Sequence, residues 1–231
     1  MKLAAHQPQY MPWLGYFDKM RRVDLFVLLD TVQYKKNKWQ NRNRIRSAGG
    51  WQWITVPVRH RFPMRIDEIR IDDTTGWRRK HEESIRQAYA RAPYAETATP
   101  LIGRLLAQPI GDLASLNALG VRMLTEALQV FTPIVVASSL AGIPDGPDAR
   151  LIALCRRFGC DTYLAGQGGR EYMDLALWRQ AGIAVEFQEF RHPVYPQCHP
   201  GFEPCLSAVD ALMQCGPRAA GLLRSMLQAA A

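Results

Sequence analysis

The sequence predicts an α/β fold in which a layered, mostly parallel sheet is flanked by helices. A short apolar segment at residues 2–6, a helical segment at residues 14–22 and a continuous apolar run at residues 24–30 give a strand, a helix and a strand in close succession. The second half of the chain repeats this alternation. With 231 residues, 48% of them apolar, the chain can bury a sizeable core, so we expect one domain over residues 1–231.

The middle of the chain departs from this alternation. The segment at residues 51–58, "WQWITVPV", alternates apolar and polar residues, and residues 66–72, "IDEIRID", carry isoleucines near strand spacing. We expect these two segments to pair as a hairpin-like insertion that follows a basic loop at residues 34–46. Residues 76–130 have a mostly helical pattern interrupted by prolines, which predicts a mainly helical insertion or subdomain.

Strands and helices alternate clearly after residue 130. The predicted strands are residues 133–140, 162–166 and 184–190, and the predicted helices are residues 146–159, 170–182 and 207–217. The first of these helices has Pro147 near its first turn and Gly159 after its last. The final helix begins at Ser207, which together with Asp210 forms a capping box. The alternation favours a parallel sheet.

The positive charge lies in the first third of the chain. Residues 1–80 hold 17 Lys and Arg against 7 Asp and Glu, whereas the remainder holds 12 against 14. Much of the excess lies in residues 34–46, "YKKNKWQNRNRIR", and this concentration favours an anionic partner. We do not expect that partner to be a nucleic acid, because one short basic loop is a small footprint for a polyanion.

The cysteines and the hydropathy pattern narrow the class of protein further. The five cysteines do not show zinc-ligand spacing, so we predict no metal site. Their odd number and an N-terminus unlike a signal peptide predict reduced thiols in the cytoplasm. No apolar run approaches the roughly 20 residues that a membrane helix needs. Cys198 and Cys205 lie near His192 and His199 in the sequence, and a thiol nucleophile therefore stays open as an alternative.

Four segments that follow predicted strands are rich in polar and aromatic side chains. Because parallel strands end at one edge of a sheet, we expect these segments to converge on one ligand cleft. Taken singly, each also fits a structural role, such as a core histidine, a helix cap or a rigid proline turn. The candidate residues in these segments are His6, Gln7, Tyr10, Asp30, Gln33, Gln167, Tyr172, His192, Tyr195 and Gln197.

Several motifs resemble, in order, those of the WbqC-like family of bacterial proteins. They are "HQPQYMPWLGYFDKM", "LDTVQYKKNKWQNRNRIR", "WITVPV", "TYLAGQGGREYM", "HPVYPQ" and "LSAVDALMQCG". The resemblance implies a biosynthetic enzyme, a transferase, of surface-polysaccharide (O-antigen, lipopolysaccharide) or natural-product pathways. The family motif covers Gln7, Pro8, Tyr10, Trp13, Gly15, Tyr16, Asp30, Gln33, Trp39, Asn41, Arg42, Asn43, His192, Pro193, Tyr195 and Gln197. Cys205 replaces the residue usual in the family and Cys198 falls outside the motif, which puts a family-wide cysteine mechanism in doubt.

The opening strand, turn, helix and second strand are also similar to the start of the nucleotidylyltransferase-type fold, which is HUP- or Rossmann-like. In that fold a turn containing histidine contacts a nucleotide phosphate, and His6 lies in the matching place. The usual second histidine is absent, and Trp13 and Tyr16 surround its position instead. Nucleotidyl or glycosyl transfer on a nucleotide sugar therefore remains an alternative.

The leading hypothesis is acyl or aminoacyl transfer from an activated, phosphate-bearing donor to an amine or hydroxyl of a sugar or related metabolite. Lys38, Arg42 and Arg44 would hold the phosphates of a nucleotide, coenzyme A or the phosphopantetheine of an acyl carrier protein. A protein that only binds a carrier-linked intermediate, without catalysis, is the alternative from another class.

The hypothesis assigns catalytic roles to side chains from three segments. His6 or His192 would deprotonate the acceptor, because imidazole titrates near neutral pH. Asp30 would orient that imidazole or hold a sugar hydroxyl. Asn41 and Asn43 would donate hydrogen bonds to the carbonyl oxygen that becomes negative in the transition state.

Overall fold

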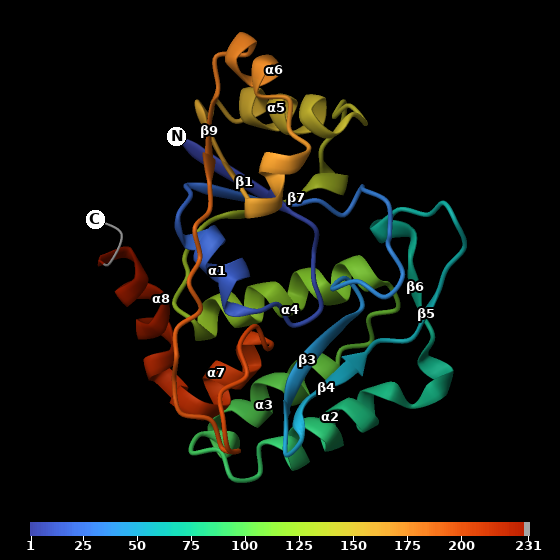
Figure 1. The fold of residues 1–231 in the computed structure, drawn as a ribbon. Helices are drawn as coiled ribbons and strands as arrows, with labels where there is room; N and C mark the ends of the chain where they lie inside the picture. Colours follow the sequence, from blue (N-terminus) through green and yellow to red (C-terminus); the bar gives the residue numbers. More distant parts are fainter. Residues whose placement is uncertain (229–231) are drawn as a thin grey trace.

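The computed structural model describes residues 1–228 and has a five-stranded parallel sheet at its centre (Figure 1). Every pair of neighbouring strands in this sheet is parallel, which confirms the predicted α/β class with a parallel sheet flanked by helices. The strands, in their order across the sheet, are β7 (Ile134–Val136), β2 (Leu25–Leu28), β1 (Lys2–His6), β8 (Thr162–Ala165) and β9 (Ala184–Phe187).

The strand order reverses between β1 and β8. From β1 the chain proceeds outward to β2 and then to β7, and it returns across the sheet to β8 before continuing to β9. Connections therefore diverge at the carboxyl ends of β1 and β8. In open α/β sheets such a point leaves a crevice in which ligands bind.

Alternating side chains of the sheet face two separate cores. Leu3 and Ala5 of β1 pack with α5 (Pro147–Arg157) and α6 (Leu175–Gln180), whereas Ala4 packs on the opposite side. That opposite side is covered by α1 (Leu14–Arg21) and α4 (Leu113–Ala127). The two-residue period of a strand explains why adjacent residues of β1 enter different cores.

The long connection from β2 to β7 holds two hairpins. The antiparallel strands β3 (Arg42–Ser47) and β4 (Gly50–Thr55) form the larger one, and β5 (Val58–Arg59) pairs with β6 (Arg70–Ile71). The predicted pairing of residues 51–58 with residues 66–72 is therefore wrong over most of its length. The end of the predicted basic loop, residues 42–46, is part of a strand, because the two-residue turn at Ala48 and Gly49 makes its pairing with β4 the local choice.

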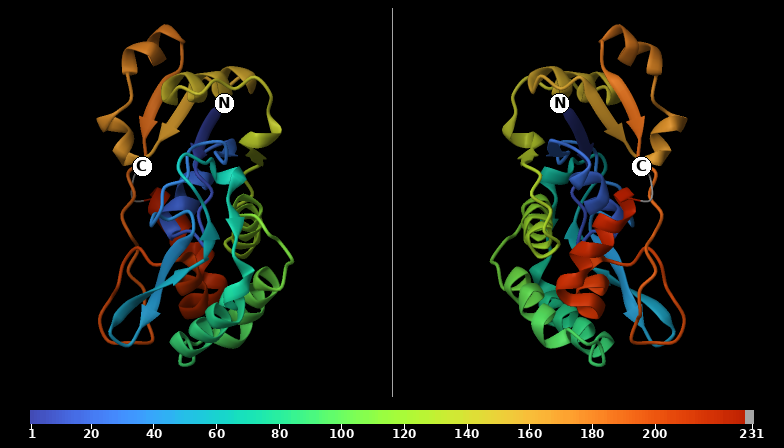
Figure 2. Two further views of the ribbon diagram at one scale, coloured as in Figure 1. Left: turned by 90° about the vertical axis from the view of Figure 1, so that its right-hand side faces the viewer. Right: turned by 90° about the vertical axis from the view of Figure 1, so that its left-hand side faces the viewer.

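The helices of the middle segment share their core with the C-terminal helices. These are α2 (Trp77–Ala88), α3 (Ala95–Leu106) and α4, packed with α7 (Ala208–Cys215) and α8 (Ala219–Gln228). Figure 2 shows α5 and α6 at one end of the molecule and α2 and α3 at the other. One continuous apolar cluster joins α1 and one face of the sheet to these five helices.

Two predicted helices begin differently from expectation. Residues Gln167–Glu171 form a 3₁₀ turn, and α6 starts only at Leu175, because the Asp174 side chain accepts a hydrogen bond from the Ala176 N–H. At the start of α7 the Ser207 hydroxyl accepts from the Val209 N–H, but Asp210 does not complete a capping box. Its carboxylate instead accepts hydrogen bonds from Tyr195 and Gln197.

None of the helices in residues 1–228 combines the length and apolar character required to cross a membrane. In the same residues, His, Cys, Asp and Glu side chains do not gather in threes in a way that suits a metal ion.

Candidate functional site

His6 lies at the carboxyl end of β1, where the strand order reverses, and it lines three cavities. The largest, of about 610 Å³, opens toward the β3–β4 hairpin, and we call it the rim cavity. The other two, of about 270 and 330 Å³, lie against the ends of β1 and β8, and we call them the floor cavities. Together these three form the cleft that the strand order predicts.

The protonation state of His6 follows from its contacts. Its Nδ1 lies 3.0 Å from the carbonyl oxygen of Gln7, and since a carbonyl can only accept, Nδ1 carries the proton. Burial, aided by the charge of Lys19, lowers the pKa of His6 to about 4. The ring is therefore neutral near pH 7, and its Nε2, which has no hydrogen-bond partner among the described residues, keeps a free lone pair.

The rim cavity is positively charged. Lys35, Lys38 and Arg44 contribute to its lining, and no carboxylate does. An anionic ligand therefore fits this cavity better than a neutral one. The full lining is His6, Gln7, Gln9, Trp13, Lys35, Lys38, Trp39, Arg44 and Cys205.

A ladder of tryptophan and arginine side chains extends from the rim cavity along the β3–β4 hairpin. The Arg44 guanidinium lies 5.5 Å from the ring centroid of Trp39 and 4.9 Å from that of Trp51, and Arg42 lies 4.1 Å from Trp53. The three indoles stay between 38% and 39% exposed. Cation–π stacking holds the arginines in place beside exposed aromatic faces.

The floor cavities contain a lysine that sequence reasoning missed. Lys19 of α1 is 3% exposed, its Nζ donates to the carbonyl oxygen of Ala5 at 3.1 Å, and it lines both floor cavities beside His6. The sequence did contain a signal for this residue. Lys19 shares a helix face with Tyr16 and Met20, and an apolar face of this kind is expected to be buried.

Residues 7–13, between β1 and α1, form a bend that we call the elbow, and its Gln9 was also not among the predicted site residues. It is 7% exposed and lines the rim cavity, and its Oε1 has no hydrogen-bond partner among the described residues. Buried amides normally satisfy such atoms, so an unpaired one beside a cavity is a candidate ligand contact. Cys205, which lines the same cavity, stays a thiol because burial raises its pKa.

About half of the residues predicted for the site converge on the cleft. Trp13, Tyr16 and Gln167 line one floor cavity, and Tyr172 lines the other. Together with His6, the converging residues are Gln7, Trp13, Tyr16, Lys38, Trp39, Arg44, Gln167 and Tyr172.

Tyr10, Asn41 and Asn43 are committed to structural contacts instead. The Tyr10 hydroxyl lies 2.9 Å from Nδ1 of buried His81, so Tyr10 does not point into the cleft. The Asn43 amide donates to the carbonyl oxygens of Tyr10 at 3.1 Å and Met11 at 2.7 Å, while Asn41 donates to Val56 at 3.0 Å. Two hydrogen bonds thus engage the Asn43 amide and one engages the Asn41 amide, and neither residue lines the three cavities, so the structure does not bring them to the predicted oxyanion contact.

Asp30 and Gln33 follow β2 but do not line the cleft. The Asp30 carboxylate accepts a hydrogen bond from the Ser138 N–H at 2.9 Å, which ties the end of β2 to the turn after β7. Burial raises its pKa. Asp30 therefore makes a structural contact in place of the predicted contact with an imidazole. Gln33 is exposed, and its backbone forms an isolated antiparallel β-bridge with that of Arg65.

His192, Tyr195 and Gln197 do not line the three cavities. The chain after β9 runs along the molecule toward α7 (Figure 1). The Nδ1 of His192 donates to the carbonyl oxygen of Pro193, and the ring packs against Phe190 and Phe202. Tyr195 and Gln197 bind Asp210. Of residues 190–197, only Phe190 lines the cleft. Within the described chain, His6 is the one histidine that lines it.

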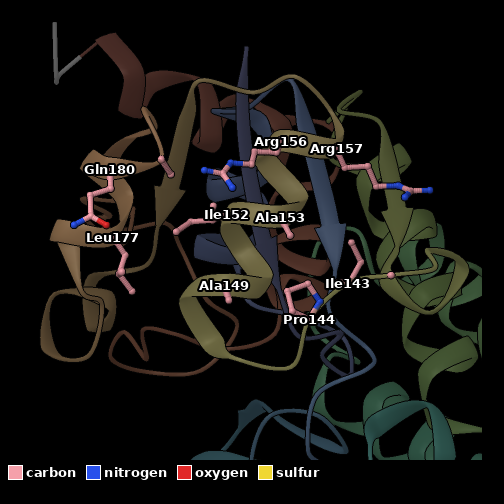
Figure 3. A pocket seen from close by; sticks show the side chains of 11 residues that line it. Ile143, Pro144, Ala149, Ile152, Ala153, Arg156, Arg157, Leu177 and Gln180 are labelled. Atoms are coloured by element: carbon pink, nitrogen blue, oxygen red, sulfur yellow. The ribbon is translucent and has the colours of Figure 1, made fainter.

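A larger hollow lies elsewhere, on α5 and α6 (Figure 3). It has a volume of about 910 Å³ and is lined mainly by aliphatic side chains, with Arg156, Arg157 and Gln180 at its edges. No imidazole, thiol or carboxylate lines it. Reactive side chains therefore single out the cleft at His6 and not this larger hollow.

Fold and site together define an α/β protein of Rossmann-type strand order with a polar cleft at the point where the order reverses. The chain belongs to the WbqC-like protein family, whose profile matches residues 7–221 and confirms the resemblance in the motifs. "Uncharacterized protein Rv1507c" of Mycobacterium tuberculosis H37Rv is 35% identical over 227 residues, 96% of this chain and 97% of that protein. No solved structure matches the chain significantly.

Proposed function

We propose that the protein is a biosynthetic transferase that moves an acyl or aminoacyl group from a phosphate-bearing donor to an amine or hydroxyl of a sugar or related metabolite. The observation that carries this proposal is the place of His6, which lines both the cationic rim cavity and the floor cavities and whose Nδ1 alone is engaged, by the Gln7 carbonyl oxygen. The assignment to surface-polysaccharide or natural-product pathways rests on the family resemblance alone.

In this proposal the rim cavity holds the donor. Lys35, Lys38 and Arg44 pair with its phosphates, whether it is coenzyme A, a carrier-bound phosphopantetheine or a nucleotide. The adjoining indoles offer stacking faces for an aromatic base. The reactive end of the donor then reaches His6, which lines the same cavity.

His6 acts as the general base. Its Nε2 takes the proton of the acceptor amine or hydroxyl as that atom bonds to the acyl carbon. The bond from the acyl carbon to the donor's sulfur or oxygen then breaks, and the proton passes from His6 to the leaving group. A pKa of about 4 makes the free ring a weak base, and an anionic substrate beside the ring would raise that pKa toward neutrality.

The proposal is tested by comparing His6→Ala with His192→Ala. The purified proteins are given acyl-coenzyme A donors and amino-sugar acceptors, and release of free coenzyme A thiol is measured. We expect His6→Ala to lose about 100-fold or more of the activity and His192→Ala to keep it, because only His6 lines the cleft. Full activity of His6→Ala would contradict the role of the base.

Nucleotidyl transfer is the second candidate, and the strand order favours it. A histidine at the end of the first strand, where the order reverses, is suited to contact a nucleotide phosphate. Release of pyrophosphate from a nucleoside triphosphate in the presence of a sugar phosphate would identify this reaction. Binding of donors without turnover in either assay would instead favour a carrier-binding module.

A further inference from the structure

Lys19 is a buried lysine that the proposed base mechanism does not use. A lysine ammonium has three N–H donors, and Lys19 uses one of them, toward the Ala5 carbonyl oxygen. The neighbouring carboxylate, Asp18, is engaged elsewhere: it pairs with Arg22 at 2.8 Å and accepts from Gln188 at 2.8 Å. The remaining donors of Lys19 therefore lack a carboxylate partner in the described chain.

The surroundings of Lys19 suit an acidic ligand. Neither floor cavity is lined by an Asp or Glu side chain, so an incoming anion meets no like charge there. Besides the Ala5 carbonyl, the Lys19 Nζ has the ring of Tyr163 at 5.9 Å from its centroid, but no anion among the described residues. Burial of an ammonium without an anionic partner is unfavourable, and an anion that enters the cavity would relieve that cost.

The backbone beside Lys19 leaves room for close approach. Gly166 and Gly168 follow β8 and line both floor cavities. A Cβ atom built on either glycine would meet nothing within 4 Å, so the backbone borders open space. By contrast, a Cβ on the next residue, Gly169, would lie 2.9 Å from the sulfur of Met173. The backbone therefore borders open space at Gly166 and Gly168, but not at Gly169, which also lines one floor cavity.

We propose that Lys19 forms an anion site on the floor of the cleft, and that this site binds the acidic group, a carboxylate or phosphate, of a small metabolite. Cavities of about 270 and 330 Å³ suit a ligand of that size. The identification of this metabolite as the acceptor rests on the proposed function, whereas the anion site does not. With its acidic group on Lys19, the acceptor's amine or hydroxyl faces His6, and the donor's phosphates occupy the rim.

Titration of the full chain with inorganic phosphate and with sodium acetate tests the site. Backbone amide resonances of Ala5, Gly166 and Gly168 report on the floor, and those of Lys38 and Trp39 report on the rim. We expect saturable shifts of the floor resonances, and we expect Lys19→Met to weaken this binding about 10- to 100-fold. Tighter binding of phosphate assigns a phosphorylated ligand, and tighter binding of acetate assigns a carboxylate.

Lys36→Met is the matched control, because it removes the same charge from an exposed side chain outside the cavities. It should bind both anions at the floor as the wild type does. The thermal midpoint of Lys19→Met should not fall, which excludes unfolding as the cause of lost binding. Wild-type binding in Lys19→Met, shifts confined to the rim, or no binding of either anion would overturn the proposal.

The His6→Ala variant separates this proposal from the proposed function. Phosphate or acetate should still bind at the floor of that variant, because the charged partner is Lys19. Loss of transfer with retained anion binding supports both proposals. Retained transfer in His6→Ala would contradict the base mechanism alone, and unchanged anion binding in Lys19→Met would contradict the anion site alone.

Discussion

At the scale of single residues, the partner of each buried polar side chain separates structural roles from functional ones. Asn43 and Tyr10 are buried and bonded to protein atoms, so they hold the chain in place. Gln9 and Lys19 are also buried and line the cleft, but the Gln9 Oε1 has no protein partner and the Lys19 ammonium has a carbonyl but no carboxylate partner in the described chain. Incompletely paired buried polar groups are costly, so these two residues are the stronger candidates for ligand contacts.

Lys19 should lower the stability of the ligand-free protein. Burial lowers its pKa from 10.5 to about 7, so its protonation opposes folding. This cost is absent above pH 10.5, grows as the pH falls toward 7, and is complete below 7. Lys19→Met should therefore raise the free energy of unfolding at pH 7 by about 2–5 kcal/mol, measured by urea denaturation. A less stable Lys19→Met would show that the ammonium supports the fold.

His6 should titrate well below an ordinary histidine. Burial favours the neutral ring, so the pKa of His6 falls from 6.5 to about 4. The free energy of unfolding should therefore decrease as the pH drops from 6.5 to about 4, because the unfolded chain binds a proton on His6 before the folded protein does. Ring resonances followed by NMR between neutral pH and pH 4 should show His6 uncharged until the lower end. In Lys19→Met the pKa of His6 should rise, since a positive neighbour has been removed. A midpoint near 6.5 in the wild type would contradict the buried, neutral ring.

At the scale of elements, the elbow after β1 is held by the β3–β4 hairpin. Asn43 of β3 bonds two successive carbonyls of the elbow, and Met11, the second of them, has a φ of 44°. A residue other than glycine needs local support in this left-handed region. The hairpin therefore fixes the path of the elbow, and with it Gln9 and Trp13 in the wall of the rim cavity.

Replacing Asn43 tests this role. Asn43→Ala removes two buried hydrogen bonds and should lower the free energy of unfolding by about 2–4 kcal/mol, measured by chemical denaturation. Gln33→Ala, at an exposed position, should change stability little and serves as the control. If Asn43→Ala kept full stability and lost only turnover, the asparagine would be an oxyanion donor after all.

At the scale of the whole molecule, the middle segment is not separated from the sheet. Asn117 of α4 donates to the carbonyl oxygens of Pro8 at 3.2 Å and Gln40 at 2.7 Å. One helix side chain thus joins the elbow to the basic loop at residues 34–46. The apolar cluster beneath the sheet also includes residues from α2, α3 and α4. Residues 76–130 thus contribute directly to the core on which α1 and the sheet rest.

We therefore expect the chain to unfold in one cooperative step. Far-UV circular dichroism, which follows all helices, and tryptophan fluorescence should give coincident denaturation curves. Asn117→Ala should shift both curves together to lower denaturant, because it breaks the contacts of α4 with Pro8 and Gln40. Two resolved transitions, or a shift of one curve alone, would show that the helical segment is a separate folding unit.

The sequence by itself determined the α/β class, the parallel sheet and the presence of His6, Gln7 and the basic residues near one strand end, because periodicity and strand ends are local properties of the chain. It could not distinguish Asn43 from Gln9, since both are amides in polar segments and differ only in their distant neighbours. The tertiary structure decided that Lys19 enters the cleft while His192 and Asp30 do not. Such outcomes depend on which side of a helix or extended segment meets the cavity, and packing between residues far apart in the chain sets that geometry.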